Sequence, residues 1–277
     1  MAEQVLFQGQ PALRLAIGPQ DAILVALHGG HLLSWTARGQ ERLYLSPKAI
    51  FDGQAAIRGG VPVCLPQFNE RGPLGARAKH GFVRNLAWAT VAGPAGQLVL
   101  QLADSEATRA LWPHAFRCEL RFILGAGSLR IELLAHNTGE AAFAMTGALH
   151  SYFAVEAIET ARLRGLDGAL CLDTVAGHAG RQSGDVLFGT EVDNVYDAVP
   201  GALELQGGAS PLRLSQSPSW GHTVVWNPGP VKGPALADLP ADGWRRFVCV
   251  EAAQVLSPVQ VPSGAHWQGW QQFDLLA

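Results

Sequence analysis

The stretch "FRCELRFILGAGSLRIELLAHNTG", Phe116–Gly139, decides the fold class of this chain of 277 residues. Apolar and polar residues alternate on both sides of Gly125-Ala126-Gly127. A period of two places alternate side chains on opposite faces of a β-strand, and a short glycine-containing link between two such runs is typical of a hairpin. The stretch therefore predicts two antiparallel strands.

The same alternation recurs along the chain, bounded by Gly, Pro or Asn, and only "SEATRALW" favours a helix, of one or two turns. No linker, low-complexity tract or change of composition divides the sequence. We therefore expect one all-β domain over residues 1–277, a large sandwich of antiparallel sheets with very little helix. The other predicted strands lie in "QLVLQLAD", "AFAMTGALHSYFAV", "LRLSQS", "HTVVWNP" and "RRFVCVEAA".

Composition restricts the possible partners and the location. A net charge of −3 and a pI near 6.3 argue against nucleic acid or an anionic membrane surface. No signal peptide or transmembrane span is expected, because the apolar runs are short and broken by charge. The four cysteines form no C-x-x-C pair, which indicates reduced, buried thiols in a cytoplasmic protein.

Positive charge is concentrated in one segment, Ile57–Trp88, "IRGGVPVCLPQFNERGPLGARAKHGFVRNLAW". It holds four arginines, one lysine and one histidine, although only 16% of the whole chain is charged. Flanking glycines and prolines restrict the backbone that presents these side chains. Because the chain as a whole is acidic, the segment predicts a site for a small anion rather than for a polymer.

Several histidines require sorting between structural and functional roles. His28 and His31 in "LHGGHLLSW" are separated by two glycines, which indicate a tight turn, so we interpret both as structural. A metal site built from His80, His114 and His150 has no H-x-H pair or H-x-x-x-H helix to support it. No metal site is therefore predicted.

Three polar residues on apolar strands are candidates for proton transfer. His150 in "TGALHSYF" must be hydrogen-bonded in the core or functional. Glu251 in "FVCVEAA" is either salt-bridged or poised for proton transfer, because an unpaired buried carboxylate is costly. Asp193 in "GTEVDNVY" is also compatible with ordinary turn chemistry. Brought together, the three would form a general acid/base site for a polyol.

These residues lie in motifs that together resemble the aldose 1-epimerase (galactose mutarotase) superfamily, and most closely its hexose-6-phosphate mutarotase branch. The resemblance implies a galactose mutarotase-like β-supersandwich with an open concave face, and chemistry that needs neither metal nor organic cofactor. It rests on "HGGHLLSW", "IRGGVPVCLPQF", "HGFVRNLAW", "LHSYF", "VDNVY", "VVWNPG" and "DGWRRFVCVEAA", which occur in the family's order.

The resemblance assigns roles to four residues in turn. His150 of "LHSYF" matches the family's general acid and Glu251 of "CVEAA" its general base. His80 of "HGFVR" matches a second histidine that contacts the sugar near the ring oxygen. Asp193 of "VDNVY" matches the aspartate that binds sugar hydroxyls. Because ordinary pKa values of about 4.3 and 6.5 leave a glutamate ionised and a histidine partly protonated near neutrality, modest tuning is expected.

The resemblance also explains the positive segment. Arg58 of "RGG" and Arg84 of "HGFVR" match residues that hold the phosphate, which guanidinium groups bind through a fixed fork. Lys79 stands where some members have Gln, and we weigh a phosphate contact equally with simple exposure to solvent. Arg71 and Arg77 lie in a Gly/Pro-rich loop and are interpreted as solvated charges, with a role at the rim of the site as the alternative.

The function expected from this resemblance is interconversion of α and β anomers of a hexose 6-phosphate, with glucose 6-phosphate as the first candidate, by a monomeric enzyme. Three alternatives stay open at this point. A mutarotase for unphosphorylated aldoses would leave the two matched arginines without an anionic partner. A non-catalytic carbohydrate-binding sandwich would need no acid/base pair. A metal-dependent isomerase would need bound metal.

Overall fold

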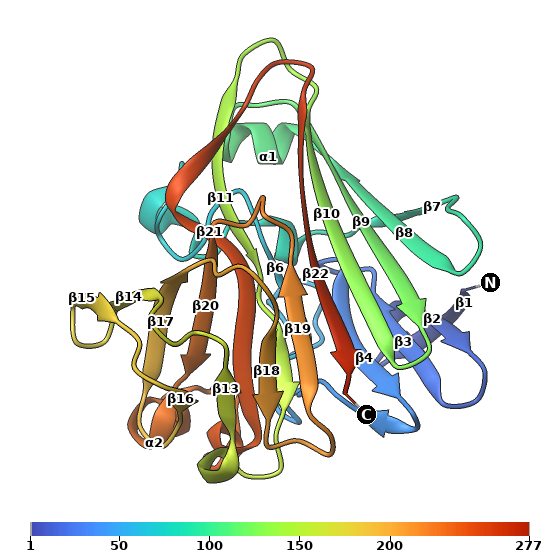
Figure 1. Cartoon of the computed structure of the whole chain (residues 1–277). Coiled ribbons are helices and arrows are strands. Elements are labelled where there is room, and N and C mark those ends of the chain that lie inside the picture. The colour runs from blue at the N-terminus through green and yellow to red at the C-terminus, as the bar shows by residue number, and fades with distance from the viewer. Residues whose placement is uncertain (1, 277) are drawn as a thin grey trace.

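The computed structural model describes residues 2–276, and its strands form three antiparallel sheets (Figure 1). The all-β expectation with little helix is confirmed. No helix in the described part of the chain is long and apolar enough to cross a membrane.

The first sheet is N-terminal and has the strand order β1-β2-β3-β4-β5, so that neighbours in sequence are neighbours in space. It lies at the side of the molecule where the chain begins (Figure 1). The strands are β1 (Glu3–Phe7), β2 (Gln10–Ile17), β3 (Asp21–Ala26), β4 (His31–Ala37) and β5 (Gln40–Glu41).

The second sheet has nine strands in the order β16-β13-β18-β19-β22-β10-β9-β8-β7 and contains the hairpin predicted above. Its two strands pair in antiparallel register from Ser128↔Gly125 to Asn137↔Phe116, as the alternation requires. The strands are β7 (Ala89–Val91), β8 (Gln97–Ala103), β9 (Phe116–Gly125), β10 (Ser128–Asn137), β13 (Arg162–Arg164), β16 (Val186–Leu187), β18 (Leu203–Gln206), β19 (Leu212–Gln216) and β22 (His266–Leu275).

The third sheet has the order β15-β14-β17-β20-β21-β11-β6, and β12 pairs with β21 beside this path. The long strand β21 therefore organises the sheet, because it pairs with β20, β11 and β12 in turn. The strands are β6 (Val63–Cys64), β11 (Phe143–Leu149), β12 (Tyr152–Ala154), β14 (Leu170–Asp173), β15 (His178–Arg181), β17 (Val192–Asp197), β20 (His222–Asn227) and β21 (Phe247–Val261).

Helices are few and short. The helix predicted in "SEATRALW" is present, and Ser105 and Thr108 close its N-terminus with a capping box. The helices are α1 (Glu106–Leu111), α2 (Gly229–Lys232) and the 3₁₀ turns η1 (Gly75–Ala78), η2 (Val83–Asn85), η3 (Ile158–Thr160), η4 (Gly233–Ala235) and η5 (Gly243–Arg246).

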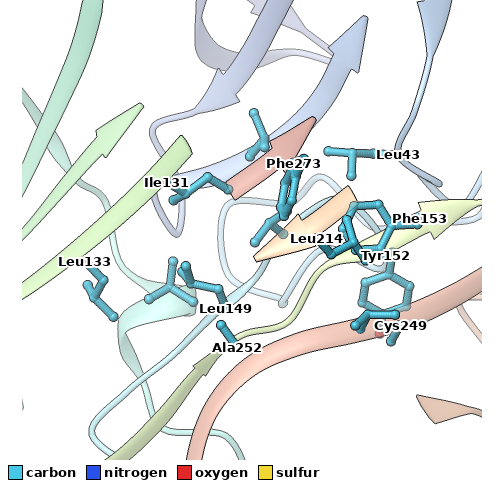
Figure 2. Packing of buried hydrophobic residues seen from close by; sticks show 14 of the residues in the cluster. Leu43, Ile131, Leu133, Leu149, Tyr152, Phe153, Leu214, Cys249, Ala252 and Phe273 are labelled. Atoms are coloured by element: carbon cyan, nitrogen blue, oxygen red, sulfur yellow. The ribbon is translucent and has the colours of Figure 1, made fainter. Parts of the chain in front are cut away.

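One continuous hydrophobic core joins the three sheets, and Phe273 of β22 lies where they meet. Its ring is 5.6 Å from that of Trp35 in β4 and 4.8 Å from that of Phe153 in β12. Figure 2 shows Phe273 and Phe153 among the buried aliphatic side chains. A shared core of this kind supports the expectation of a single domain, which stays a prediction. All four cysteines are free thiols, and only Cys171 is not fully buried.

Candidate active site

A cavity of about 270 Å³ opens beside the third sheet. Charged, polar and aromatic side chains from several separate segments of the chain meet in it. The residues predicted from the sequence that line it are Arg58, Lys79, His80, Arg84, His150, Asp193 and Glu251.

Strand register places the polar side chains on one face of the sheet. Asp193 of β17 is directly opposite Trp226 of β20, and Val224 of the same strand is opposite Glu251 of β21. Because Val224 and Trp226 are two residues apart, they point to the same face. His150 directly follows β11, and its backbone N–H donates to the carbonyl of Pro62 at 3.0 Å. The sheet thus carries the candidate acid, base and sugar-binding carboxylate side by side.

Asp193 does not lie in a turn, so that alternative is wrong. It is the second residue of β17, which pairs with β14 on one side and β20 on the other. The Asp-Asn sequence resembles a turn locally, but strands on both sides supply hydrogen bonds that a turn would not receive. The half-buried side chain of Asp193 lines the cavity, and burial raises its pKa.

His150 and Glu251 form a close buried pair, with 3.3 Å between Nδ1 and Oε1. Glu251 is 0% exposed and His150 only 7%. Neither His150 Nδ1 nor either carboxyl oxygen of Glu251 has a properly oriented hydrogen-bond partner among the described residues. Buried polar atoms without such partners are rare in proteins and are typical of functional sites. The cavity is therefore the place where a ligand would complete these contacts.

Burial dominates the protonation of this pair. It raises the pKa of Glu251 well above the ordinary value, and the charge of Asp193 adds to the rise. It lowers the pKa of His150 well below the ordinary value, and His80, Arg58 and Arg84 add to the fall. The expectation that modest tuning suffices is wrong here, because both groups are withdrawn from water. Burial favours the neutral pair.

The neutral pair and the ion pair contain the same single proton. They differ only in whether Glu251 or His150 carries it, across a contact of 3.3 Å. The proton therefore belongs to the pair rather than to one residue, as expected for strongly coupled groups. Such a unit can take one proton from a ligand at one end and deliver another at the other end.

His80 is held in an unusual backbone conformation beside this pair. Its φ of 62° lies in the left-handed region, which is costly for a residue other than glycine and is frequent at functional sites. Its Nδ1 accepts the backbone N–H of Asn69 at 3.1 Å, so the neutral ring carries its proton on Nε2. Burial, with Arg84 and Lys79 adding, lowers the pKa of His80 to about 3. A neutral Nε2 donor thus lines the cavity.

Two aromatic residues of the site were missed by the sequence analysis. Tyr152 stacks on the His150 ring with centroids 4.8 Å apart and an interplanar angle of 10°. Trp226 stands nearly perpendicular to the same imidazole, with centroids 5.9 Å apart, and lines the cavity. Both lie in the motifs "LHSYF" and "VVWNPG", but alternation alone describes them as ordinary strand residues. Together they restrict the rotation of the imidazole.

The arginines are anchored by partners that the sequence did not reveal. Arg58 forms an ion pair with Asp238, at 3.1 Å from Nε to Oδ1. Burial acts to lower the pKa of Arg58, but its neighbours Tyr152 and Asp238 reverse this, and the net direction is upward. Arg84 Nη2 donates to the carbonyl of Lys79 at 2.8 Å.

The other positive residues divide into two groups. Lys79 is exposed and lines the cavity, as does Lys232, which pairs with Glu191 at 2.7 Å. Arg71 and Arg77 are exposed and do not line it, which agrees with solvated loop charges. Lys232 and Asp238 were missed because the segment "GPVKGPALADLP" contains only turn signals.

Three other histidines that the sequence raised as candidates lie outside the cavity. His28 and His31 are both buried. His31 Nε2 donates to the carbonyl of Gly59 at 2.7 Å, beside Arg58. His114 packs on Trp112, with ring centroids 5.0 Å apart, and does not line the cavity. The proposed metal set that includes His114 is therefore not assembled. Within residues 2–276, no three His, Cys, Asp or Glu side chains are grouped to hold a metal ion.

We expect His31 to make stability depend on pH. Burial lowers the pKa of His31 to about 4, whereas in the unfolded chain the value is about 6.5. As the pH falls from about 6.5 towards 4, the unfolded chain binds a proton that the folded chain refuses, so stability is lost in that window. His31→Gln should reduce the slope of unfolding free energy against pH by up to about 1.4 kcal/mol per pH unit.

Urea denaturation at a series of pH values measures this slope. His178→Gln, on the exposed strand β15, is the matched control and should keep the wild-type slope. An unchanged slope in the His31 variant would show that this residue does not control the acid sensitivity.

Comparison with known proteins places these features in a family. The sequence pattern of the family "Aldose 1-epimerase" matches residues 14–274. A Salmonella typhimurium protein named "Putative glucose-6-phosphate 1-epimerase" is 40% identical over 251 residues, covering 87% of this chain and 83% of that protein. A protein of the same name from Cenchrus ciliaris is 35% identical over 261 residues, covering 88% and 78%.

The fold agrees with a solved structure as well. A crystal structure described as "a putative mutarotase (YeaD) from Salmonella typhimurium" superposes with a TM-score of 0.89 at 33% identity, covering 99% of this chain and 93% of that one. The expected mutarotase-like fold is thereby confirmed. With the family pattern matched over nearly the whole length and relatives well above 30% identity, the chain belongs to the aldose 1-epimerase family.

Proposed function

We propose that this protein interconverts the α and β anomers of a hexose 6-phosphate, with glucose 6-phosphate as the substrate to test first. The observation that carries the proposal is one cavity holding both a buried His–Glu pair and a set of cationic side chains. The names of the relatives point to the same substrate. A plain-sugar enzyme would have no use for several cations near its proton-transfer pair.

Ring opening requires one proton to leave and one to arrive. Glu251 as carboxylate takes the proton from the O1 hydroxyl, the C1–O1 double bond forms, and the C1–O5 bond breaks with its electron pair moving to O5. O5 then takes the proton from His150. Rotation about C1–C2 and the reverse steps close the ring as the other anomer. The neutral pair that burial favours is the protonation state that ring opening produces, so burial supports this step.

The other cavity residues orient the substrate. Asp193 accepts hydrogen bonds from sugar hydroxyls, and His80 donates from Nε2. Trp226 offers an aromatic face to the apolar side of the pyranose ring. Arg84 and Arg58 bind phosphate oxygens through charge-assisted hydrogen bonds. Orientation of this kind contributes to rate by holding O1 and O5 near the two proton-transfer groups.

Anomer-exchange NMR on glucose 6-phosphate beside glucose tests the proposal directly. We expect the protein to accelerate exchange of the phosphorylated sugar far more than that of glucose. Equal acceleration of both would favour a mutarotase for unphosphorylated aldoses. Tight binding of the sugar without any acceleration would favour the non-catalytic carbohydrate-binding sandwich.

Arg84 gives a prediction that separates phosphate binding from catalysis. Removing one charge-assisted contact in Arg84→Gln should cost about 1.5–3 kcal/mol, or roughly 10- to 150-fold in kcat/KM for glucose 6-phosphate. Turnover of unphosphorylated glucose should change little, because that substrate never contacts the guanidinium. Arg77→Gln is the control, since Arg77 is exposed in the same loop region and does not line the cavity.

Steady-state kinetics on both substrates measures this difference. Equal losses on glucose and glucose 6-phosphate would show that Arg84 supports the fold and not the phosphate. The thermal melting temperature of each variant distinguishes such an effect on the fold from a loss of phosphate binding.

The oligomeric state and the location of the protein are proposals too. We infer that the enzyme acts as a monomer in the cytoplasm on a small-molecule phosphosugar. Sedimentation analysis with and without glucose 6-phosphate tests the oligomeric state.

A further inference from the structure

The guanidinium of Arg58 is held from two sides before any ligand contacts it. Nε donates to Asp238 Oδ1 at 3.1 Å, and Nη1 donates to the hydroxyl of Tyr152 at 2.9 Å. The side chains of Arg58 and Asp238 are only 23% and 22% exposed. Nη2 makes no hydrogen bond to any described residue, so this edge is available to a ligand. Two fixed contacts determine the plane of the fork, and Arg58 lines the cavity.

Asp238 is itself anchored to the segment that carries Arg58. Its carbonyl accepts the hydroxyl of Ser46 at 2.6 Å, and the backbone N–H of Ser46 donates to the carbonyl of Arg58 at 3.0 Å. Asp238 and Arg58 are 180 residues apart in sequence, yet Ser46 joins their backbones. The next residue, Leu239, is 1% exposed and fastens the loop to the core. Asp238 is therefore a fixed support and not a mobile counter-ion.

The second partner of Arg58 connects it to the proton-transfer pair. The ring of Tyr152 stacks on the ring of His150, with centroids 4.8 Å apart and planes 10° from parallel. The same residue accepts the Nη1 hydrogen bond through its hydroxyl. Asp238, Arg58, Tyr152 and His150 thus form one continuous chain of contacts across the cavity. Because the rigid ring of Tyr152 contacts both groups, a displacement of the guanidinium would also displace the imidazole.

We propose that Asp238 is a positioning residue that fixes the Arg58 fork for the phosphate and, through Tyr152, supports the plane of His150. The inference rests on the proposed function, since it gives Asp238 a task only if Arg58 binds a phosphorylated sugar. A carboxylate in a cavity for phosphate is otherwise unfavourable, because the two negative charges repel. Its presence at this position is explained if orientation of Arg58 outweighs that repulsion.

The alternative, in which Asp238 acts only through its charge, predicts the opposite sign. Removing a negative charge would then strengthen phosphate binding and lower KM. In the positioning account, loss of the anchor frees the guanidinium to rotate and raises KM. Asp238→Ala removes both the charge and the acceptor, whereas Asp238→Asn removes the charge and keeps an oxygen for Nε–H. The two variants therefore separate charge from geometry.

Anomer-exchange kinetics on glucose 6-phosphate decides between these accounts. We expect Asp238→Ala to raise KM roughly 5- to 50-fold with a smaller change in kcat, because a direct phosphate contact is worth roughly 10- to 150-fold and an anchor supports part of it. Asp238→Asn should recover most of the loss. In an Arg58→Ala background, Asp238→Ala should add little, since the group that it positions is gone.

Two further variants complete the test. Tyr152→Phe keeps the stacked ring and removes the hydroxyl, so it should raise KM less than Asp238→Ala and leave the melting temperature nearly unchanged. Asp242→Ala, an exposed aspartate four residues further along that does not line the cavity, is the matched control and should behave as wild type. Calorimetric binding of glucose 6-phosphate to each variant gives a second readout that does not depend on turnover.

The outcomes distinguish the inference from the function on which it rests. A wild-type protein that binds and turns over glucose 6-phosphate, together with an Asp238→Ala variant of equal or lower KM, would overturn the positioning role alone. A purely additive double variant would do the same. A wild-type protein that neither binds nor turns over any hexose phosphate would overturn the proposed function, and this inference with it.

Discussion

Replacing Glu251 by glutamine is expected to lower the rate of anomerisation by roughly 10²- to 10⁴-fold while the protein still folds. The amide nearly matches the carboxyl in shape but cannot take the proton from the O1 hydroxyl. Because Glu251 is 0% exposed and its oxygens have no well-oriented partner among the described residues, its removal breaks no internal hydrogen bond. We therefore expect the melting temperature not to fall, since a buried carboxyl without such a partner is costly.

Anomer-exchange NMR and differential scanning calorimetry measure the two effects. Glu119→Gln is the matched control, because Glu119 is also largely buried, at 8% exposure, but lies on β9 in another sheet. Near-normal exchange by a folded Glu251→Gln protein would remove this residue from the mechanism. A large loss of stability together with activity would show a structural role instead.

Replacing His150 by asparagine is the second large effect, also roughly 10²- to 10⁴-fold in kcat. Asparagine cannot deliver a proton to O5. The wild-type rate should be nearly constant across a broad pH range, because one proton stays on the pair. It should fall only below the lowered pKa of His150 and above the raised pKa of Glu251.

The variant should lose this broad plateau, because Glu251 then titrates alone and the residual rate rises with pH as its carboxyl ionises. His222→Asn is the control, since His222 is buried on β20 but does not line the cavity. A plateau of unchanged width in His150→Asn would contradict the shared-proton account. Stopped-flow or NMR exchange rates, measured over the whole pH range in which both proteins stay folded, provide the profile.

Much of the fold could be read from local sequence. Alternation in Phe116–Gly139 predicts a hairpin because side chains of a strand point to opposite faces every second residue, and glycines permit the tight connection. The position of β22 was less visible, since its pairing with β10 depends on a partner far along the chain. Local period identifies strands, but it does not say which strands become neighbours.

The candidate site, too, contains residues that the sequence could mark and residues that only the structure could place. The order of the motifs marked His150, Glu251 and the arginines as candidates, and all of them line one cavity in the structure. Asp193 could not be placed, because the same two residues fit a turn or a strand until neighbouring strands supply hydrogen bonds. Asp238 was invisible for a simpler reason. Its partner Arg58 is 180 residues away, and nothing local in a turn-rich segment marks that pairing.

By itself, then, the sequence determined the strand-rich class, the motifs in family order and the candidates for the acid, base and cationic residues. These depend on residue types and on short periods. Only the tertiary structure decided the protonation of His150 and Glu251, the stacking of Tyr152 and the anchoring of Arg58 by Asp238. The physical reason is that burial, stacking and ion pairing each depend on neighbours that folding brings from distant parts of the chain.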